Sequence, residues 1–148
     1  MNALHPTHFF HIGITAVDID AAMAEMTRNL GVRWVGAQPL DMELCIYGEM
    51  RQVRMRIAHS VQFSPQYELI ECVPDTPWAA PSAGVHHVCY WSEDPGAVCA
   101  QLEASGSRRL LGRPGAPSGY FQSEAGMIVE IIGTEMRDHI VRTASRAA

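Results

Sequence analysis

Two histidines and two glutamates in this 148-residue chain have the residue types and spacing of a metal centre. His11 and His87 each open a strand-like run, while Glu68 and Glu130 each lie inside a later apolar run. Imidazole nitrogens and carboxylate oxygens are ligands of divalent transition metals. Because two buried carboxylates are destabilising without a cationic partner, one shared cation would explain the set. We expect these four residues to bind one divalent ion of zinc, nickel, cobalt, manganese or iron.

An internal repeat places one histidine and one glutamate of this set in each half of the chain. Residues 11–18 and 87–94 both begin with histidine and end with aspartate. Residues 67–70 and 129–132 both have glutamate second, followed by two aliphatic residues. Such self-similarity indicates a duplicated structural unit. The recurrence of both residue types at equivalent places favours one shared site over coincidence.

The aspartate that ends each repeated segment is placed to cap a helix. An aspartate side chain at this position accepts a hydrogen bond from a free backbone N–H group. Asp18 therefore predicts a helix over residues 19–30, with Gly31 as its left-handed stop. Asp94 predicts a second helix over about residues 95–105, with proline at its first position.

Short strand candidates follow each helix, so the sequence predicts a βαβββ module twice and an α+β fold. Side chains alternate across a strand, which brings all four candidate ligands to the surface opposite the helices. We expect a curved mixed sheet, a half-barrel cup, with the helices on its outer face. The strands predicted after the helices are residues 33–37, 44–47, 52–58, 67–72, 108–111, 120–122 and 127–132. The predicted units are a first module over residues 1–73, a proline-rich linker over 74–84, a second module over 85–133, and a C-terminal helix and tail over 134–148.

The composition is that of a globular protein and disfavours several functional classes. Hydrophobic residues make up 47% of the chain, charged residues 18%, and the formal net charge is −5. Because no dense basic run could neutralise phosphates, we expect no nucleic-acid partner. No apolar run approaches the roughly 20 residues of a membrane span, so we expect a cytoplasmic protein with no membrane partner. The four cysteines lack C-x-x-C spacing and are expected to be buried thiols.

Two arginines and three aromatic residues are candidates for contact with a substrate. Arg54 and Arg56 alternate with apolar residues on one predicted strand, which predicts that they lie opposite the face packed on the helix. There they could bind an anionic substrate through their guanidinium forks, or they could form a solvated strand edge. Trp91, Tyr120 and Phe121 could line the pocket or could be core aromatics.

Four other histidines receive no chemical role. His86 immediately precedes a candidate ligand and His8 lies three positions before another, so alternation turns both away from the cup. We interpret these two as structural or exposed, and we interpret His59 and His139 in the same way.

Together these motifs resemble the vicinal oxygen chelate superfamily, which includes glyoxalase I, methylmalonyl-CoA epimerase, bleomycin resistance proteins and extradiol dioxygenases. The resemblance extends over about residues 9–133. It is carried by Phe-His-Ile-Gly-Ile at residues 10–14, Tyr-Glu-Leu-Ile-Glu at 67–71, Gly-Val-His-His-Val at 84–88 and Gly-Met-Ile-Val-Glu-Ile-Ile at 126–132. It implies that the four family ligands are His11, Glu68, His87 and Glu130, in an order that looks like bacterial glyoxalase I.

The resemblance implies a metal-dependent lyase or isomerase of a small oxygenated, anionic substrate. In such an enzyme the metal stabilises charge on a carbonyl oxygen while a carboxylate moves a proton on the adjacent carbon. Glu130 is our candidate base, and Glu68 could share that role on the opposite face of the substrate. Because many relatives are dimers, the resemblance also implies a homodimer.

Three alternatives on the same fold stay open. An epimerase would have a further catalytic glutamate at a position that falls on Arg54 here. An extradiol dioxygenase would have histidine in place of Glu68. A non-catalytic small-molecule binding protein, of the resistance type, would generally lack the four ligands.

Overall fold

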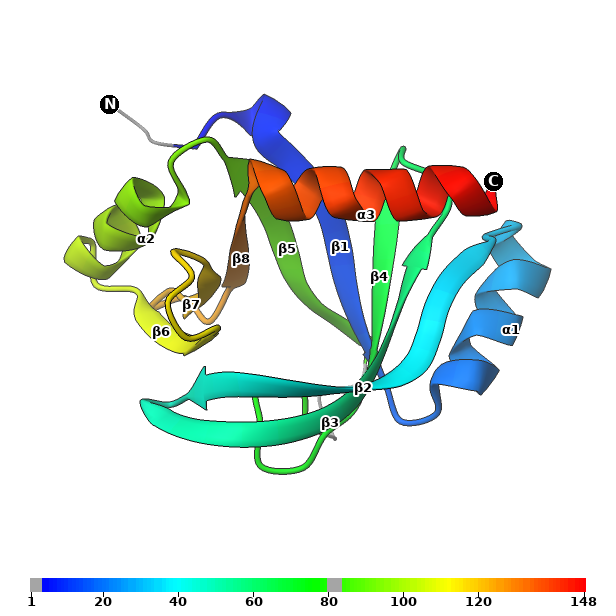
Figure 1. Cartoon of the computed structure of the whole chain (residues 1–148), viewed down its shortest axis with the longest axis horizontal. Coiled ribbons are helices and arrows are strands. Elements are labelled where there is room, and N and C mark those ends of the chain that lie inside the picture. The colour runs from blue at the N-terminus through cyan, green and yellow to red at the C-terminus, as the bar shows by residue number, and fades with distance from the viewer. Residues whose placement is uncertain (1–3, 80–83) are drawn as a thin grey trace.

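The computed structural model of the chain describes residues 4–79 and 84–148, and it confirms the predicted α+β class. Within these residues, eight strands form one curved sheet in the order β1-β4-β3-β2-β6-β7-β8-β5. The sheet closes on itself, so the predicted half-barrel is a complete ring (Figure 1). The predicted linker over residues 74–84 lies partly outside the described residues.

The two halves of the chain contain the same order of elements. The first half comprises β1 (Phe9–Ala16), α1 (Ile19–Leu30), β2 (Trp34–Ile46), β3 (Glu49–Ser60) and β4 (Gln66–Glu71). The second half comprises β5 (Gly84–Ser92), α2 (Pro95–Ala104), β6 (Arg108–Gly112), β7 (Gly119–Gln122) and β8 (Ile128–Gly133). A short 3-10 helix over Pro6–His8 precedes β1, and helix α3 (Thr134–Ala147) follows β8.

Both repeated helices begin at the predicted caps. The Asp18 side chain accepts a hydrogen bond of 3.0 Å from the backbone N–H of Ala21, and Asp94 accepts one of 3.0 Å from Ala97. Helix α1 ends at Gly31, whose φ of 69° lies in the left-handed region that glycine adopts without steric cost. The local chemistry of the caps therefore sets these boundaries.

Strand β2 differs from the sequence prediction, which placed two separate strands at residues 33–37 and 44–47. The structure has one continuous strand, with a shift in its pairing to β3 between Gly36 and Pro39. A proline is tolerated at such a bulge because its missing N–H group is not needed by the ladder there. The sequence pattern of glycine and proline thus marked an irregularity within a strand and not its end.

The strands that carry the four candidate ligands are neighbours in the ring. Strand β1 pairs in parallel with β4 and antiparallel with β5, and β5 pairs in parallel with β8. Gly13 lies opposite both Glu68 and His87, while Cys89 lies opposite Glu130. The duplicated halves therefore meet at β1 and β5, and both contribute to one interior.

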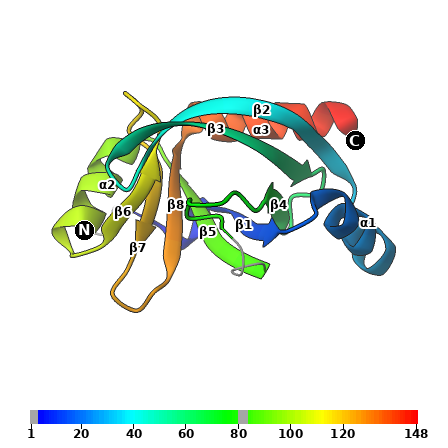
Figure 2. The ribbon, with the colours of Figure 1, turned by 90° about the horizontal axis from the view of Figure 1, so that it is seen from below.

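Helices α1 and α2 cover the outside of the ring, as predicted, whereas α3 lies across the opening of the barrel (Figures 1 and 2). On the outside, Ile19 of α1 packs with Leu69, and Val98 of α2 packs with Phe121. Helix α3 contacts strands from both halves, β2 and β3 as well as β5 and β8. Among the described residues, no helix has the length and apolar character required to cross a bilayer.

Candidate metal centre

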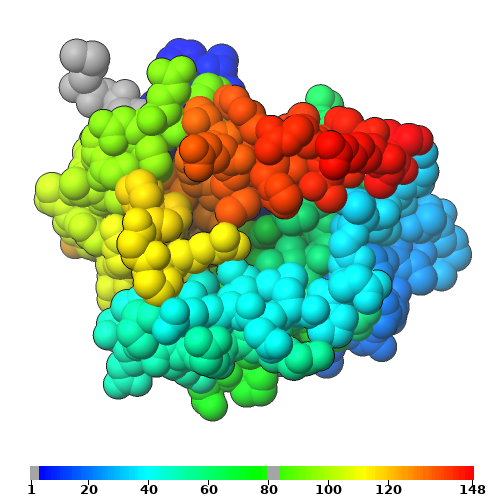
Figure 3. Space-filling view, viewed as in Figure 1, coloured from blue at the N-terminus to red at the C-terminus, as the bar shows by residue number. Residues whose placement is uncertain are grey.

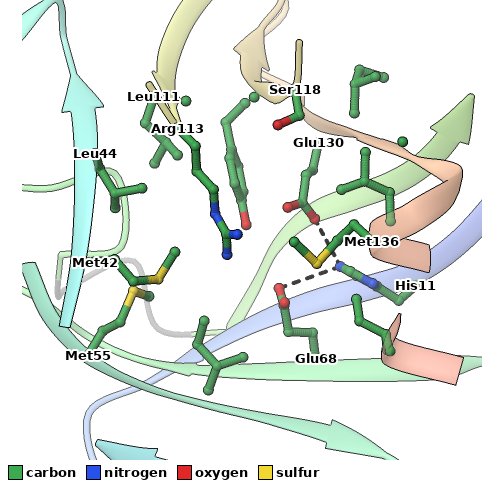
Figure 4. Close-up of a pocket in the computed structure, with 18 of the residues that line it drawn as sticks. His11, Met42, Leu44, Met55, Glu68, Leu111, Arg113, Ser118, Glu130 and Met136 are labelled. Atoms are coloured by element: carbon green, nitrogen blue, oxygen red, sulfur yellow. Dashed lines mark ion pairs between the residues drawn. The ribbon is translucent and has the colours of Figure 1, made fainter. Parts of the chain in front are cut away.

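The four predicted ligands converge inside the barrel. The Nε2 atoms of His11 and His87 lie 3.4 Å apart. The Oε2 atom of Glu130 lies 3.1 Å from Nε2 of His11 and 3.3 Å from Nε2 of His87. The Oε2 atom of Glu68 lies 3.4 Å and 3.3 Å from the same two nitrogens. Figure 4 shows the side chains of His11, Glu68 and Glu130 turned toward one point.

This arrangement fits a bound divalent ion. One donor atom from each residue lies within 4.8 Å of the others. The Oε2 atoms of Glu68 and Glu130 are buried, and apart from their ion pairs with the two histidines they have no hydrogen-bond partner among the described residues, although buried carboxylate oxygens are normally satisfied. Donor atoms spaced 3.1–3.4 Å apart, as the histidine nitrogens are from each other and from the two Oε2 atoms, can surround a point about 2 Å from each of them, which is the length of a bond from zinc to nitrogen or oxygen. A cation at this point would satisfy both carboxylates.

Charge within the cluster outweighs the effect of burial on its members. Burial lowers the pKa of His11 and His87, but neighbouring anionic groups raise both above the usual value. Burial also raises the pKa of the Cys89 thiol, which is therefore neutral at physiological pH, so the carboxylates supply this attraction. Although burial raises the pKa of the carboxyls, the histidines hold that of Glu68 well below its usual value and that of Glu130 at about 2. The metal-free cluster is consequently ionic.

Two histidines to which the sequence analysis gave no role touch the ligands. His59 Nε2 lies 3.1 Å from Oε1 of Glu68 and so holds that carboxylate in place. His86 Nδ1 lies 3.0 Å from Nδ1 of His87, and its Nε2 lies 2.7 Å from the carbonyl oxygen of Pro77. Groups behind the ligands orient metal-binding side chains in this way. For His59 the signal that could have been used is strand alternation. Its side chain lies on the same face of β3 as that of Ile57, two residues earlier, which lines the cavity.

Three of the four candidate ligands, His11, Glu68 and Glu130, line a cavity of about 360 Å³ inside the barrel. Its other walls are mainly apolar and include Met42, Leu44 and Met55 (Figure 4). Helix α3 closes part of the opening with Met136 and with residues of its next turn. On the surface, a hollow is visible between α3, β2 and the loop that joins β6 to β7 (Figure 3). A small molecule of largely apolar character would fit beside the metal ligands.

The structure places Arg54 and Arg56 outside this cavity, so the predicted face of β3 was wrong. The Arg54 guanidinium lies 3.2 Å from Asp41, and both side chains are exposed. Arg56 lies 2.8 Å from Asp20 of α1, and this pairing holds the pKa of Asp20 below its usual value. Because the barrel interior beyond the ligands is apolar, it takes the aliphatic residues of β3, and alternation turns the arginines outward.

The three predicted aromatic residues divide between the cavity and other places. Tyr120 lines the cavity, and its ring centroid is 4.7 Å from that of His87. Phe121 is a core aromatic that packs beneath α2. Trp91 stacks on His8, with ring centroids 4.2 Å apart, lies against Arg137 of α3, and does not line the cavity. Only Tyr120 of these three is therefore positioned to contact a ligand.

Comparisons with known proteins agree with this fold. The family model for the Glyoxalase/Bleomycin resistance protein/Dioxygenase superfamily matches residues 10–123. This range contains three of the four candidate ligands, whereas Glu130 and α3 lie beyond it. The comparison with curated proteins gave no match.

Several solved structures are similar to the chain. A hypothetical protein from Bacillus halodurans C-125 has a TM-score of 0.61 and 18% identity, covering 85% of this chain and 93% of that one. Methylmalonyl-CoA epimerase from Mycobacterium tuberculosis has a TM-score of 0.57 and 18% identity, covering 88% and 91%. A variant of the Streptomyces coelicolor epimerase, bound to 2-nitronate-propionyl-CoA, has a TM-score of 0.58 and 19% identity, covering 85% and 96%. At these identities the likeness concerns the fold alone.

Proposed function

Because the chain belongs to the Glyoxalase/Bleomycin resistance protein/Dioxygenase superfamily, we propose that it is a metal-dependent isomerase or lyase of the glyoxalase I type. It would move a proton on the carbon next to a carbonyl of a small oxygenated substrate. His11, Glu68, His87 and Glu130 would hold one divalent ion of zinc, nickel, cobalt, manganese or iron. The observation that carries the proposal is the convergence of two buried carboxylate Oε2 atoms and two imidazole nitrogens, in which the Oε2 atoms have no hydrogen-bond partner beyond their ion pairs with the two histidines.

The residues of the cluster supply the groups that such a reaction needs. A divalent cation bound there would stabilise negative charge on a substrate oxygen. Glu130 is ionised and lines the cavity, so its carboxylate could accept the proton from carbon. Glu68 occupies the equivalent place in the other half of the fold and could return the proton from the opposite side. Burial and the charge of Glu130 raise the pKa of Tyr120, which therefore keeps its hydroxyl proton and remains a donor.

The apolar wall of the cavity favours proton transfer at a site that is shielded from solvent. Apolar side chains surround the space beside the carboxylates, and α3 shields its opening. Electrostatic interactions are stronger where water is excluded, so charge that develops on a bound substrate would be stabilised more effectively there. This environment supports an enzyme that passes through a negatively charged form of its substrate.

An epimerase is the second candidate function. Glu68 and Glu130 lie at nearly equal distances from both histidines, as two bases acting on opposite faces of one carbon would require. The place where an epimerase would have its further glutamate is occupied by Arg54, which lies outside the cavity. The two candidates differ in product, since an epimerase inverts a stereocentre and leaves the constitution of the substrate unchanged.

Solvent isotope exchange tests the proposal. Metal-loaded protein is incubated in deuterium oxide with a panel of compact 2-oxo acids, 2-hydroxy acids and their thioesters. We expect deuterium next to the carbonyl of at least one compound, with no uptake after chelation of the metal. Glu130→Gln should lower the rate by about 10²- to 10⁴-fold, while Glu43→Gln, an exposed carboxylate on β2, should not.

The metal content of each variant is measured alongside, so that loss of the base is separated from loss of the ion. Oxygen consumption without isotope uptake would contradict the proposal and indicate a dioxygenase. A protein that binds aromatic compounds but no metal would contradict it in favour of a binding protein.

From the family resemblance we also propose that the protein is a homodimer, and from its sequence composition we propose that it lies in the cytoplasm. All four ligands come from one chain, so the metal centre itself does not require the partner.

A further inference from the structure

Arg113 stands at the opening of the metal cavity. It follows β6 directly and lines both the inner cavity and an outer cavity of about 480 Å³. The two cavities share Arg113, Ser118, Gly133, Met136 and His139, and therefore meet at this ring of residues. Figure 4 shows the guanidinium of Arg113 extended into the inner cavity, on the side opposite His11. A molecule that reaches the metal ligands from the outer cavity must pass this group.

The guanidinium of Arg113 has no protein partner among the described residues. Other arginines nearby are paired: Arg109 lies 2.8 Å from Glu103, and Arg137 lies 2.7 Å from Asp138. Glu93 and Glu135 line the outer cavity, yet no ion pair joins either of them to Arg113 in the described part of the chain. Arg113 thus presents five N–H donors to the cavity with no acceptor assigned to them.

The backbone around Arg113 is held in place. Its carbonyl oxygen accepts a hydrogen bond of 3.2 Å from the N–H of Ala116. Arg109 donates to the carbonyl oxygen of Ser118 at 3.2 Å, which fixes the other end of the loop. Pro114 and Pro117 further restrict the loop, because proline fixes φ. Ordering this loop on binding would therefore cost little conformational entropy.

We infer that Arg113 binds an anionic oxygen group of the substrate, a carboxylate or a phosphate, while the other end of the molecule faces the four metal ligands. This inference rests on the proposed function and names its substrate class. The guanidinium fork matches the geometry of carboxylate and phosphate oxygens. Arg113, which faces the cavity, would thus bind the anionic group that Arg54 and Arg56 were expected to bind.

The cavity between the two ends restricts the body of the substrate. Its volume of about 360 Å³ is near the lower limit for small-molecule sites, and Met42, Leu44 and Met55 line it with apolar groups. Thioether side chains adapt to different shapes. The substrate class is therefore a compact acid with an aliphatic or aromatic body, oxygenated at the end away from its charge.

Hydroxamate probes of graded length test the inference. Zinc-loaded protein is titrated calorimetrically with the monohydroxamates of succinic, adipic and suberic acids and with their methyl esters. The hydroxamate oxygens would bind the zinc ion, and only the acids carry a negatively charged group that Arg113 could bind. At one chain length we expect the acid to bind about fivefold more tightly than its ester, since the arginine is partly exposed and screened. Phosphonates of the same lengths show which of the two anions is preferred.

Arg113→Met should remove the preference for the charged probe while the ester binds as before. Arg28→Met is the matched control, because Arg28 is exposed on α1 and does not line the cavity. Metal-loaded protein that binds every charged probe no better than its ester, or Arg113→Met protein that keeps the preference, would overturn the inference alone. A protein that takes up neither zinc nor any of the other candidate ions, or that binds none of the hydroxamates when loaded with metal, would overturn the proposed function and this inference with it.

Discussion

Gly13 is the residue whose replacement probes the metal centre most selectively without removing a ligand. It lies on β1 directly opposite His87, and a Cβ atom there would overlap the imidazole ring of His87. The ring would have to move by more than about 1 Å to restore van der Waals contact. Metal–ligand distances vary by only about 0.2 Å, so the displaced Nε2 could no longer bind. Gly13→Ala should therefore lower metal affinity by roughly 10- to 100-fold and stability by about 1–3 kcal/mol.

Competition with a chromophoric chelator measures the affinity, and thermal unfolding measures the stability. Gly96→Ala is the matched control, because a Cβ at Gly96 would make only ordinary contacts, with Pro117 at 3.5 Å and Asp94 at 3.6 Å. As Gly96 lies in α2, alanine there should be neutral or stabilising by about 0.5–1 kcal/mol. If Gly13→Ala bound metal as tightly as the wild type, His87 would not be a ligand in this geometry.

Three further predictions follow from the contacts around the cluster. His59→Ala should weaken metal binding about tenfold by releasing Glu68, and His59→Gln should restore part of it, as chelator competition will show. Because neighbouring carboxylates raise the pKa values of His11 and His87, both imidazoles keep their protons to a higher pH than usual in the metal-free protein. Metal binding should therefore release about one to two protons, and the metal affinity should fall as the pH falls. Calorimetry in buffers of different ionisation enthalpy measures the number of protons released, and a value of zero would contradict this prediction. Arg54→Met should change stability by less than about 1 kcal/mol and leave ligand affinity unaltered, whereas a loss of affinity in the hydroxamate titration would return Arg54 to the site.

The convergence of the four candidate ligands could be predicted from the sequence because the duplication and the strand period carry independent information. His11 and His87 repeat in one context and Glu68 and Glu130 in another, and alternation assigns each to a face. The ends of α1 likewise follow from local chemistry, since a cap and a left-handed glycine act within a few residues. These features needed no knowledge of tertiary contacts.

The substrate-contacting residues could not be predicted in the same way. Both faces of β3 are occupied, one by the cavity and the other by α1 and solvent, so its alternation of Arg54 and Arg56 with Met55 fits either orientation. In the structure the same alternation that turns the arginines outward turns His59 inward, toward Glu68. Arg113 lies in a loop, where side chains do not alternate as they do along a strand. Only the packing of that loop beside α3 brings Arg113 to the cavity.

Elemental analysis of the purified protein tests the shared cation most directly. We expect one transition-metal ion per chain in the wild type, and loss of that ion in both His11→Ala and His87→Ala proteins that remain folded by circular dichroism. A folded wild type that stays metal-free after incubation with each candidate ion, or histidine variants that keep a full complement of metal, would contradict it.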